Sequence, residues 1–419
     1  MNSRQRFHAA LNHKQPDRVC VDLGATPVTS IAASALSRFR RRVLGDSGYR
    51  VKVTEPFQML GEVDDALREA IGIDVVGVWG RRTFFGFENR DWKPLTLFDG
   101  TPVLVPGQFN ITMETNGDWL IYPEGDTTAP PSGRMPKDGF YFDAIIRQAP
   151  IDDSRLDPAD NLEEFAPLTD QDVQDFVHRA DCAAASDCGV IMSLPGTGLG
   201  DIAMVPAPFL KHPKGIRDVQ EWYISTLLRK DYLHAVFERQ TEIAVGNIQR
   251  LAAAVGERVG AVFVCGTDFG TQRAPVLSPE HYRELYSPYY RRINRAIHEC
   301  SSWKTFKHTC GSVYRLLPDL IADGFDILNP VQCSAAEMDA ERLKKEFGDA
   351  LVFWGGGVNT QQTLPYGTPE EVYWEARQRI DVFNDNGGFV FTPVHNIQAP
   401  TPVENIDAMF RAIRDSAKA

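Results

Sequence analysis

The sequence lacks the features of a secreted or membrane protein. Its first residues, MNSRQRFHAALNHKQPDR, contain no apolar core of the signal-peptide type, and no stretch approaches the roughly 18 apolar residues of a membrane span. The seven cysteines are an odd number and are widely scattered, which is not the pattern of a disulfide framework and favours reduced thiols. Low-complexity tracts and long runs of one charge are also missing. We therefore expect a globular cytoplasmic protein.

Basic residues are scarce relative to acidic ones. The chain has 44 Lys and Arg against 56 Asp and Glu, a formal net charge of −12. Because nucleic acids and most membrane surfaces are anionic, this excess argues against either as the main partner. With 43% hydrophobic residues over 419 positions the chain can bury a large core, and single α/β barrels with insertions reach this length. We expect one barrel domain over residues 1–419.

From about residue 187 onward, short apolar runs alternate with amphipathic stretches. GVIMSLPG (189–196), GAVFVCG (260–266) and LVFWGGG (351–357) are typical of strands, and the region 216–255 is typical of a long helix. Strands this rich in Val, Ile, Phe and Leu indicate a parallel sheet covered by helices. No G-x-G-x-x-G follows a strand, so a dinucleotide-binding open sheet is not supported. The pattern predicts an α/β fold, a (β/α)8 TIM barrel.

The first half of the chain is less regular. VCVDLGAT (19–26) predicts the first strand and IAASALSRFRRRVLG (31–45) a helix. Residues 82–165 are rich in aromatics, Gly, Pro and Asp, and contain alternating stretches such as TPVLVPG. They predict an insertion of β-hairpins and loops that covers the barrel mouth. Near the end of the chain, TPVE predicts a helix start with Thr401 as N-cap and Glu404 completing a capping box.

Chemically distinctive side chains follow one predicted strand after another. KHTCG places His308 and Cys310 two apart on extended backbone, where both side chains point to the same side. Asp268, Cys333 and His395 each stand at or just beyond the end of another strand. In a barrel these ends converge on one face. Cys and His are the ligands that zinc prefers, whereas magnesium and calcium prefer oxygen, so this set favours zinc.

Two kinds of metal site are compatible with these residues. His308, Cys310 and His395 would form a catalytic site with an open position, and adding Cys333 would fill that position and make the site structural. Without a metal, His308 would be an ordinary hydrogen-bonded histidine. Asp268 has two interpretations as well: it caps the turn after its strand, or it acts as a general acid or hydrogen-bond partner for a substrate.

Four segments together resemble the uroporphyrinogen decarboxylase superfamily. The resemblance spans most of the chain except the insertion and implies a (β/α)8 barrel enzyme. The segments are SRQRFHAALNHKQPDRV (3–19), GTDFGTQRAPVLSPEHYRELYSPYY (266–290), HTCGSVYRLLPDLIADGFDILNPVQ (308–332) and GGFVFTPVHNIQAPTPVENI (387–406).

The two branches of that superfamily imply different chemistry. Uroporphyrinogen decarboxylases need no cofactor and grip porphyrinogen carboxylates with an arginine-bearing motif of the RQAGRYLPEY kind, where this chain has DLGATPVTS (22–30). The other branch contains zinc methyltransferases that work with corrinoid proteins, in which an H-x-C pair and a later Cys bind zinc. His308 and Cys310 match the pair, and His395 stands where those enzymes carry the later Cys.

The second branch implies a corrinoid-linked methyltransferase. A methyl group would move between a small methylated substrate or thiol and a corrinoid, with Zn2+ activating the substrate heteroatom. The corrinoid (cobalamin) would be carried by a separate protein, because this chain has no D-x-H-x-x-G signature. Asp268 is the expected catalytic residue, and Asn329, Gln332, Asn396 and Gln398 are expected either to contact substrate or to cap loop backbone.

Two other functions are compatible with the same sequence. One is a metal-independent decarboxylase that acts on a different carboxylated substrate. The other is a barrel without catalytic activity that serves as a binding partner. Zinc bound through His308 and Cys310 would favour methyl transfer over both.

Overall fold

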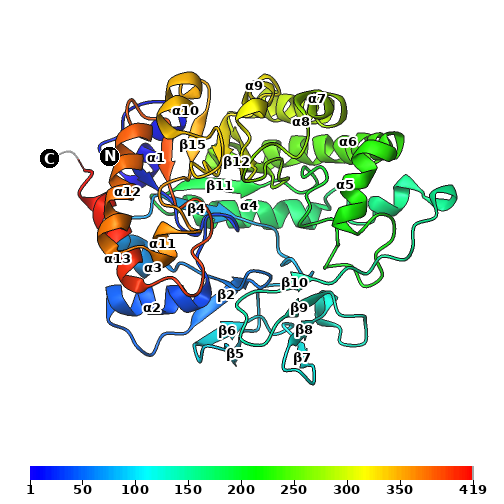
Figure 1. Cartoon of the computed structure of the whole chain (residues 1–419), viewed down its shortest axis with the longest axis horizontal. Coiled ribbons are helices and arrows are strands. Elements are labelled where there is room, and N and C mark those ends of the chain that lie inside the picture. Colours follow the sequence, from blue (N-terminus) through cyan, green and yellow to red (C-terminus); the bar gives the residue numbers. More distant parts are fainter. Residues whose placement is uncertain (418–419) are drawn as a thin grey trace.

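The computed structural model describes residues 1–417 and contains an eight-stranded parallel sheet (Figure 1). Its order is β1-β16-β15-β14-β13-β12-β11-β4, and the backbone N–H of Asp74 donates to the carbonyl of Val21 (2.8 Å), which joins the two end strands. The prediction of a (β/α)8 barrel is confirmed. The strands are β1 (Cys20–Val21), β4 (Val75–Val78), β11 (Gly189–Ser193), β12 (Ala261–Cys265), β13 (Lys304–His308), β14 (Ile327–Asn329), β15 (Val352–Trp354) and β16 (Phe389–Phe391).

Helices alternate with these strands along the chain and surround the barrel. Within the described residues, no helix is long and apolar enough to cross a membrane. The helices are α1 (Ser3–Leu11), α2 (Ala33–Leu44), α3 (Asp65–Ile71), α4 (Asp170–Ala184), α5 (Val219–Leu228), α6 (Lys230–Val255), α7 (Pro279–Leu285), α8 (Ser287–Cys300), α9 (Leu317–Ala322), α10 (Ala340–Phe347), α11 (Thr363–Tyr366), α12 (Pro369–Phe383) and α13 (Val403–Arg414).

Two helix boundaries differ from the predictions. The region 216–255 contains two helices, because the backbone leaves the helical conformation at Arg229 (φ −128°, ψ 45°). The predicted capping box at Thr401 is wrong. Pro402 is extended (φ −62°, ψ 135°) and is itself the N-cap of α13, so Glu404 lies one position too early in the helix to complete the box.

Helix α1 closes the amino-terminal end of the barrel. Phe7 is fully buried and packs edge to face on Trp354 inside the barrel, with ring centroids 5.9 Å apart. A Cβ atom on Gly189 would lie 2.1 Å from Cγ of Phe7, and one on Gly260 would lie 2.8 Å from its Cε1. Glycine at these two strand starts therefore makes room for the Phe7 ring.

A buried ion-pair cluster fixes the same end. Asp74, whose side chain is fully buried, accepts from Arg6 Nη1 on Oδ1 (2.6 Å) and from Arg18 Nη1 on Oδ2 (2.7 Å). Its Oδ2 also accepts the backbone N–H of Val21 (2.9 Å). Both oxygens of the carboxylate are therefore used to join α1, β1 and β4.

Two small sheets lie together on one side of the barrel, away from α7–α10 (Figure 1). The first has the order β3-β2-β6-β5 and the second the order β10-β9-β8-β7, which is antiparallel throughout. Hairpins are thus present in the region 82–165, and Phe85, Phe87, Phe109 and Phe142 form their buried core. The strands are β2 (Val51–Glu55), β3 (Leu60–Gly61), β5 (Lys93–Thr96), β6 (Pro102–Val105), β7 (Ile111–Met113), β8 (Trp119–Ile121), β9 (Gly133–Met135) and β10 (Asp143–Ala144).

Candidate metal centre

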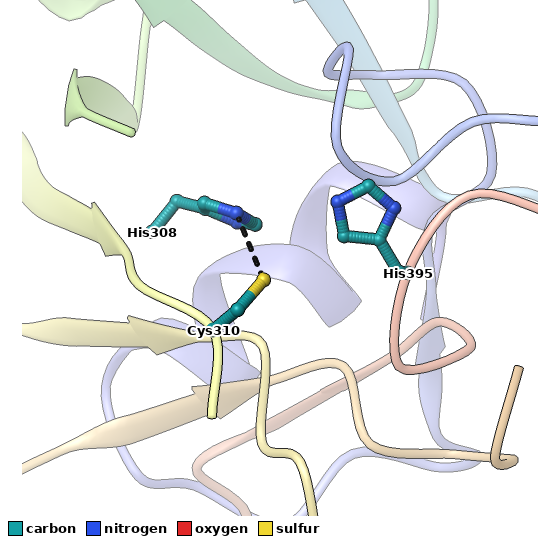
Figure 2. A group of neighbouring side chains, drawn as sticks. All are labelled: His308, Cys310 and His395. Carbon is teal, nitrogen blue, oxygen red and sulfur yellow. Dashed lines mark hydrogen bonds between the residues drawn. The ribbon is translucent and has the colours of Figure 1, made fainter. Parts of the chain in front are cut away.

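Three potential metal ligands meet at the carboxyl-terminal end of the barrel. His308 is the last residue of β13, Cys310 follows it by two residues, and His395 lies on the loop after β16. One donor atom from each residue lies within 4.8 Å of the other two. Figure 2 shows the three side chains pointing toward one another from two separate segments of the chain. The convergence of strand ends in a barrel produces this group from residues that are far apart in sequence.

The imidazole of His308 is held in one orientation by its neighbours. Its Nδ1 donates to Oδ1 of Asn329 (2.6 Å), and Nδ2 of Asn329 in turn donates to the carbonyl of Trp354 (2.8 Å). This leaves Nε2 of His308 facing Sγ of Cys310 (3.5 Å). Metal-binding histidines usually have their second nitrogen fixed in this way. The Asn329–His308 pair therefore prepares Nε2 to act as a ligand.

Burial keeps both histidines neutral. It lowers the pKa of His395 to about 4, with a further contribution from His308 nearby, and it also lowers the pKa of His308. A neutral imidazole offers the lone pair that a metal ion needs. Burial and the Asp268 carboxylate raise the pKa of the Cys310 thiol. A zinc ion bound here would displace the thiol proton of Cys310 and be held by a thiolate and two neutral imidazoles, a donor set that suits zinc.

Asp268 lies beside this group and supports the loop that carries Cys310. Its Oδ1 accepts the backbone N–H of Cys310 (2.7 Å) and lies 3.8 Å from Nε2 of His308. The side chain is 30% exposed and lines the cavity described below. Asp268 therefore caps the loop after β13 rather than the turn after its own strand, and it also presents a carboxylate to the cavity.

Cys333 is not part of the group. It is half-buried near Glu375 and Arg379 of α12, and burial raises the pKa of its thiol to about 11. Its side chain packs with the outer hydrophobic core, away from the three donors that converge. The structure therefore brings together three of the four predicted ligands, the number expected for a catalytic rather than a structural site.

Two of the residues predicted to contact substrate, Asn329 and Gln332, form hydrogen bonds within the protein close to the ligand group. Asn329 orients His308, as described above. Gln332 accepts the backbone N–H of Gly311 (2.9 Å) and donates to Oε1 of Gln272 (2.9 Å). Neither residue lines the cavity.

The other two predicted contacts lie on the loop after β16. Asn396 accepts the backbone N–H of Ser30 on Oδ1 (2.7 Å), and its Nδ2 donates to the carbonyl of Pro27 (2.7 Å) and to Oε1 of Gln58 (2.9 Å). Gln398 lines the cavity, unlike the other three amide residues.

A large cavity connects the candidate ligands with the small sheets. Its volume is about 1350 Å³, and its wall includes His308, His395 and Asp268 on the barrel side. Aromatic rings from both sides also face it, among them Trp79 and Phe263 of the barrel and Phe57 and Phe84 beyond it. The cavity is large enough to hold a small molecule against the ligand group.

The sequence interpretation missed Asp201, which lies on the loop after β11 and lines the same cavity. Its Oδ1 accepts the backbone N–H of Ala203 (3.1 Å), and burial followed by the nearby Asp268 carboxylate raises its pKa to about 6. A Cβ atom on Gly266 would lie 2.8 Å from its Oδ2. An Asp after the glycine-rich end of a predicted barrel strand, SLPGTGLGD, was the available signal.

Fold and site together define a (β/α)8 barrel with a candidate metal centre on its carboxyl-terminal face. The family model described as uroporphyrinogen decarboxylase (URO-D) matches residues 207–416, about half of the chain, and this range contains His308, Cys310 and His395. The chain belongs to the uroporphyrinogen decarboxylase family.

Solved structures provide a second comparison. A methyltransferase from Methanosarcina mazei superposes with a TM-score of 0.52 over 99% of this chain and 99% of its own, at 15% sequence identity, which shows a shared fold. The Penicillium canescens endo-1,4-beta-xylanase XylE is 10% identical, with a TM-score of 0.34 over 59% of this chain and 80% of its own. No curated protein sequence matches the chain.

Proposed function

We propose that this protein is a zinc-dependent methyltransferase that moves a methyl group between a small methylated substrate or a thiol and the corrinoid of a separate protein. The observation that carries the proposal is the group of His308, Cys310 and His395, whose donor atoms lie within 4.8 Å of one another beside a large cavity. Three protein ligands leave one zinc position for a substrate.

The residues around the group support this chemistry. A bound zinc ion would activate the substrate heteroatom, either by holding a thiol as thiolate or by withdrawing electrons from a methylated oxygen or nitrogen. Asn329 keeps Nε2 of His308 directed toward the group. Asp268 lies next to Cys310 and is partly exposed to the cavity. In this proposal it exchanges a proton with the heteroatom that loses or gains the methyl group.

The second reactant in this proposal is a corrinoid on a partner protein. The membership in the uroporphyrinogen decarboxylase family and the resemblance of the H-x-C pair to that of its methyltransferases support it. The chain itself lacks the D-x-H-x-x-G cobalamin signature. We infer that the partner docks over the cavity lined by the barrel and the small sheets.

The cavity gives less support to a decarboxylase that grips substrate carboxylates. Its wall contains three cationic side chains, and each faces an acidic residue: Lys52 lies 3.2 Å from Glu62, Arg68 lies 2.8 Å from Asp65, and Arg82 lies 3.7 Å from Glu124. Over residues 1–417 the cavity wall therefore offers no uncompensated cation to a carboxylate. Methyl transfer at the His/Cys/His group needs none.

Metal analysis of the purified protein tests the proposal. We expect about one zinc per chain in the wild type, as for three-ligand catalytic sites, and loss of that zinc in His308→Ala, Cys310→Ala and His395→Ala. Cys333→Ala is the matched control and should retain the metal, since Cys333 lies outside the group. The wild type should also methylate reduced cobalamin from its substrate, measured by the change in the corrinoid absorbance. Wild-type protein that binds no zinc when prepared without chelator would overturn the proposal.

A further inference from the structure

The wall of the cavity opposite the barrel carries a carboxylate with no cationic partner. Glu55, the last residue of β2, accepts the backbone N–H groups of Phe57 (3.0 Å) and Gln58 (2.8 Å). Among the ion pairs of residues 1–417 it has none, whereas Glu62 on the same wall is paired with Lys52. Burial without a compensating cation raises the pKa of Glu55 to about 7. A cation entering the cavity would find this carboxylate available.

Aromatic rings stand next to Glu55. The ring of Phe57, two residues along the chain, lies 4.5 Å from that of Phe84 between centroids, and both line the cavity. Trp79 also lines it, and its indole is fixed because Nε1 donates to the carbonyl of Ala25 (2.9 Å). The faces of aromatic rings attract cations, most strongly where water is excluded. Glu55 and these rings thus combine two kinds of cation recognition.

The turn after Glu55 is tied to the candidate metal centre. Gln58 donates its backbone N–H to Glu55, and its side-chain Oε1 accepts from Nδ2 of Asn396 (2.9 Å). Asn396 follows His395 directly in the chain. One continuous set of bonds therefore fixes the position of Glu55 relative to a candidate ligand, within a single cavity.

We propose that Glu55 and the Phe57–Phe84 ring pair form a subsite for a cationic group of the substrate, a protonated or methylated ammonium. The cation belongs to the same molecule as the methylated oxygen, sulfur or nitrogen that is presented to the His/Cys/His group. This assignment rests on the proposed methyl transfer. It specifies that the substrate is a cationic amino compound. The ammonium is the binding handle in this arrangement and is not the methyl donor.

Binding of two probes of equal shape tests the subsite on the intact protein. Choline carries a quaternary nitrogen, and 3,3-dimethyl-1-butanol has a neutral carbon in its place. Isothermal titration calorimetry should show choline binding about tenfold or more tightly than its neutral counterpart, the size of effect expected for a desolvated cation on aromatic rings beside a carboxylate. Equal affinity for the two probes, or no choline binding, would overturn the proposal.

Variants locate the effect. Glu55→Gln removes the charge and keeps an acceptor for one of the two backbone N–H groups. It should weaken choline binding about tenfold and leave the neutral probe unaffected. Phe84→Leu should reduce the preference for choline by a smaller factor. Glu62→Gln, on the same wall but paired with Lys52, should preserve wild-type binding. A Glu55→Gln variant with an unchanged ratio of the two affinities would contradict the assignment.

Zinc content measured on the same preparations separates this proposal from the one on which it rests. Wild-type protein that prefers choline but binds no zinc would retain the cation subsite and refute the zinc methyltransferase. Protein that holds zinc through His308 and Cys310 but does not distinguish the two probes would support the zinc site and refute the cation subsite.

Discussion

The two ends of the barrel use their buried polar side chains in opposite ways. At the amino-terminal end, the buried carboxylate of Asp74 has both oxygens occupied by arginines and a backbone N–H. At the carboxyl-terminal end, His308, Cys310 and His395 converge but contact one another only loosely, and Asp268 remains 30% exposed. Polar groups whose bonds are all satisfied within the chain stabilise a fold. Groups left with unused lone pairs beside a cavity are available to a ligand.

The largest expected effect comes from breaking the amino-terminal end. Asp74→Asn leaves Arg6 and Arg18 without their buried counter-charge and should lower the free energy of unfolding by about 3–5 kcal/mol. Urea denaturation followed by circular dichroism measures it. Asp17→Asn is the control: Asp17 also contacts Arg6 but is 43% exposed, so its loss should cost less than about 1 kcal/mol. Equal effects of the two variants would contradict a special role for the buried pair.

At the carboxyl-terminal end, the candidate ligand group should increase the free energy of unfolding of the protein only when a metal is supplied. Zinc at about 100 times its dissociation constant should raise the free energy of unfolding of metal-free wild type by about 2.7 kcal/mol, because the folded state alone presents the three donors together. Cys310→Ser should abolish that increase. Thermal denaturation with and without zinc measures both. A similar increase in the variant would show that zinc binds elsewhere.

Asn329 combines the features of the two ends. Its amide forms hydrogen bonds within the protein, and one of them orients the imidazole of His308, whose Nε2 remains available to a metal. Asn329→Leu removes the acceptor for Nδ1 of His308 and should weaken zinc binding about 10–100-fold. Competition with a chromogenic chelator gives the dissociation constant. At saturating zinc the variant should still bind the wild-type amount of metal, which a general collapse of the site would prevent.

A smaller effect concerns pH and the unpaired carboxylate of Glu55. Its pKa in the folded state is about 7, above the ordinary value of 4.5, so folding favours the protonated form. Its contribution is therefore fully favourable below pH 4.5 and is lost as pH rises through 7. Between pH 5 and pH 8, wild type should lose about 1–2 kcal/mol of unfolding free energy relative to Glu55→Gln. Parallel stability curves for the two proteins would contradict it.

Much of this comparison could be predicted from the sequence. The alternation of strongly apolar strands with amphipathic helices predicted the barrel, and the positions of His308, Cys310 and His395 after strands predicted their convergence. This worked because barrel topology brings strand ends together whatever their separation in the chain.

Other features depend on tertiary contacts that leave no local pattern. Asn396 and Gln332 were expected either to contact substrate or to cap loop backbone, and their amides accept the backbone N–H groups of Ser30 and Gly311. The sequence does not single out Glu55, because this residue ends a strand outside the barrel and lines the cavity only through the packing of the small sheets. The sequence does not show whether the polar atoms of an amide or carboxylate side chain have hydrogen-bond partners in the folded protein.

The closing of the barrel has a consequence for how the protein is made. Cys20 of β1 pairs with Val390 of β16, and the Ser30–Asn396 bond spans 366 positions. During translation, β1 can pair with β16 only after residues 389–391 have emerged from the ribosome. His395 follows β16 closely in the chain and leaves the ribosome at the same stage of translation, so the cavity wall and the candidate ligand group form together. We expect nascent chains truncated before β16 to expose apolar surface and to depend on chaperones, because so many of their contacts are non-local.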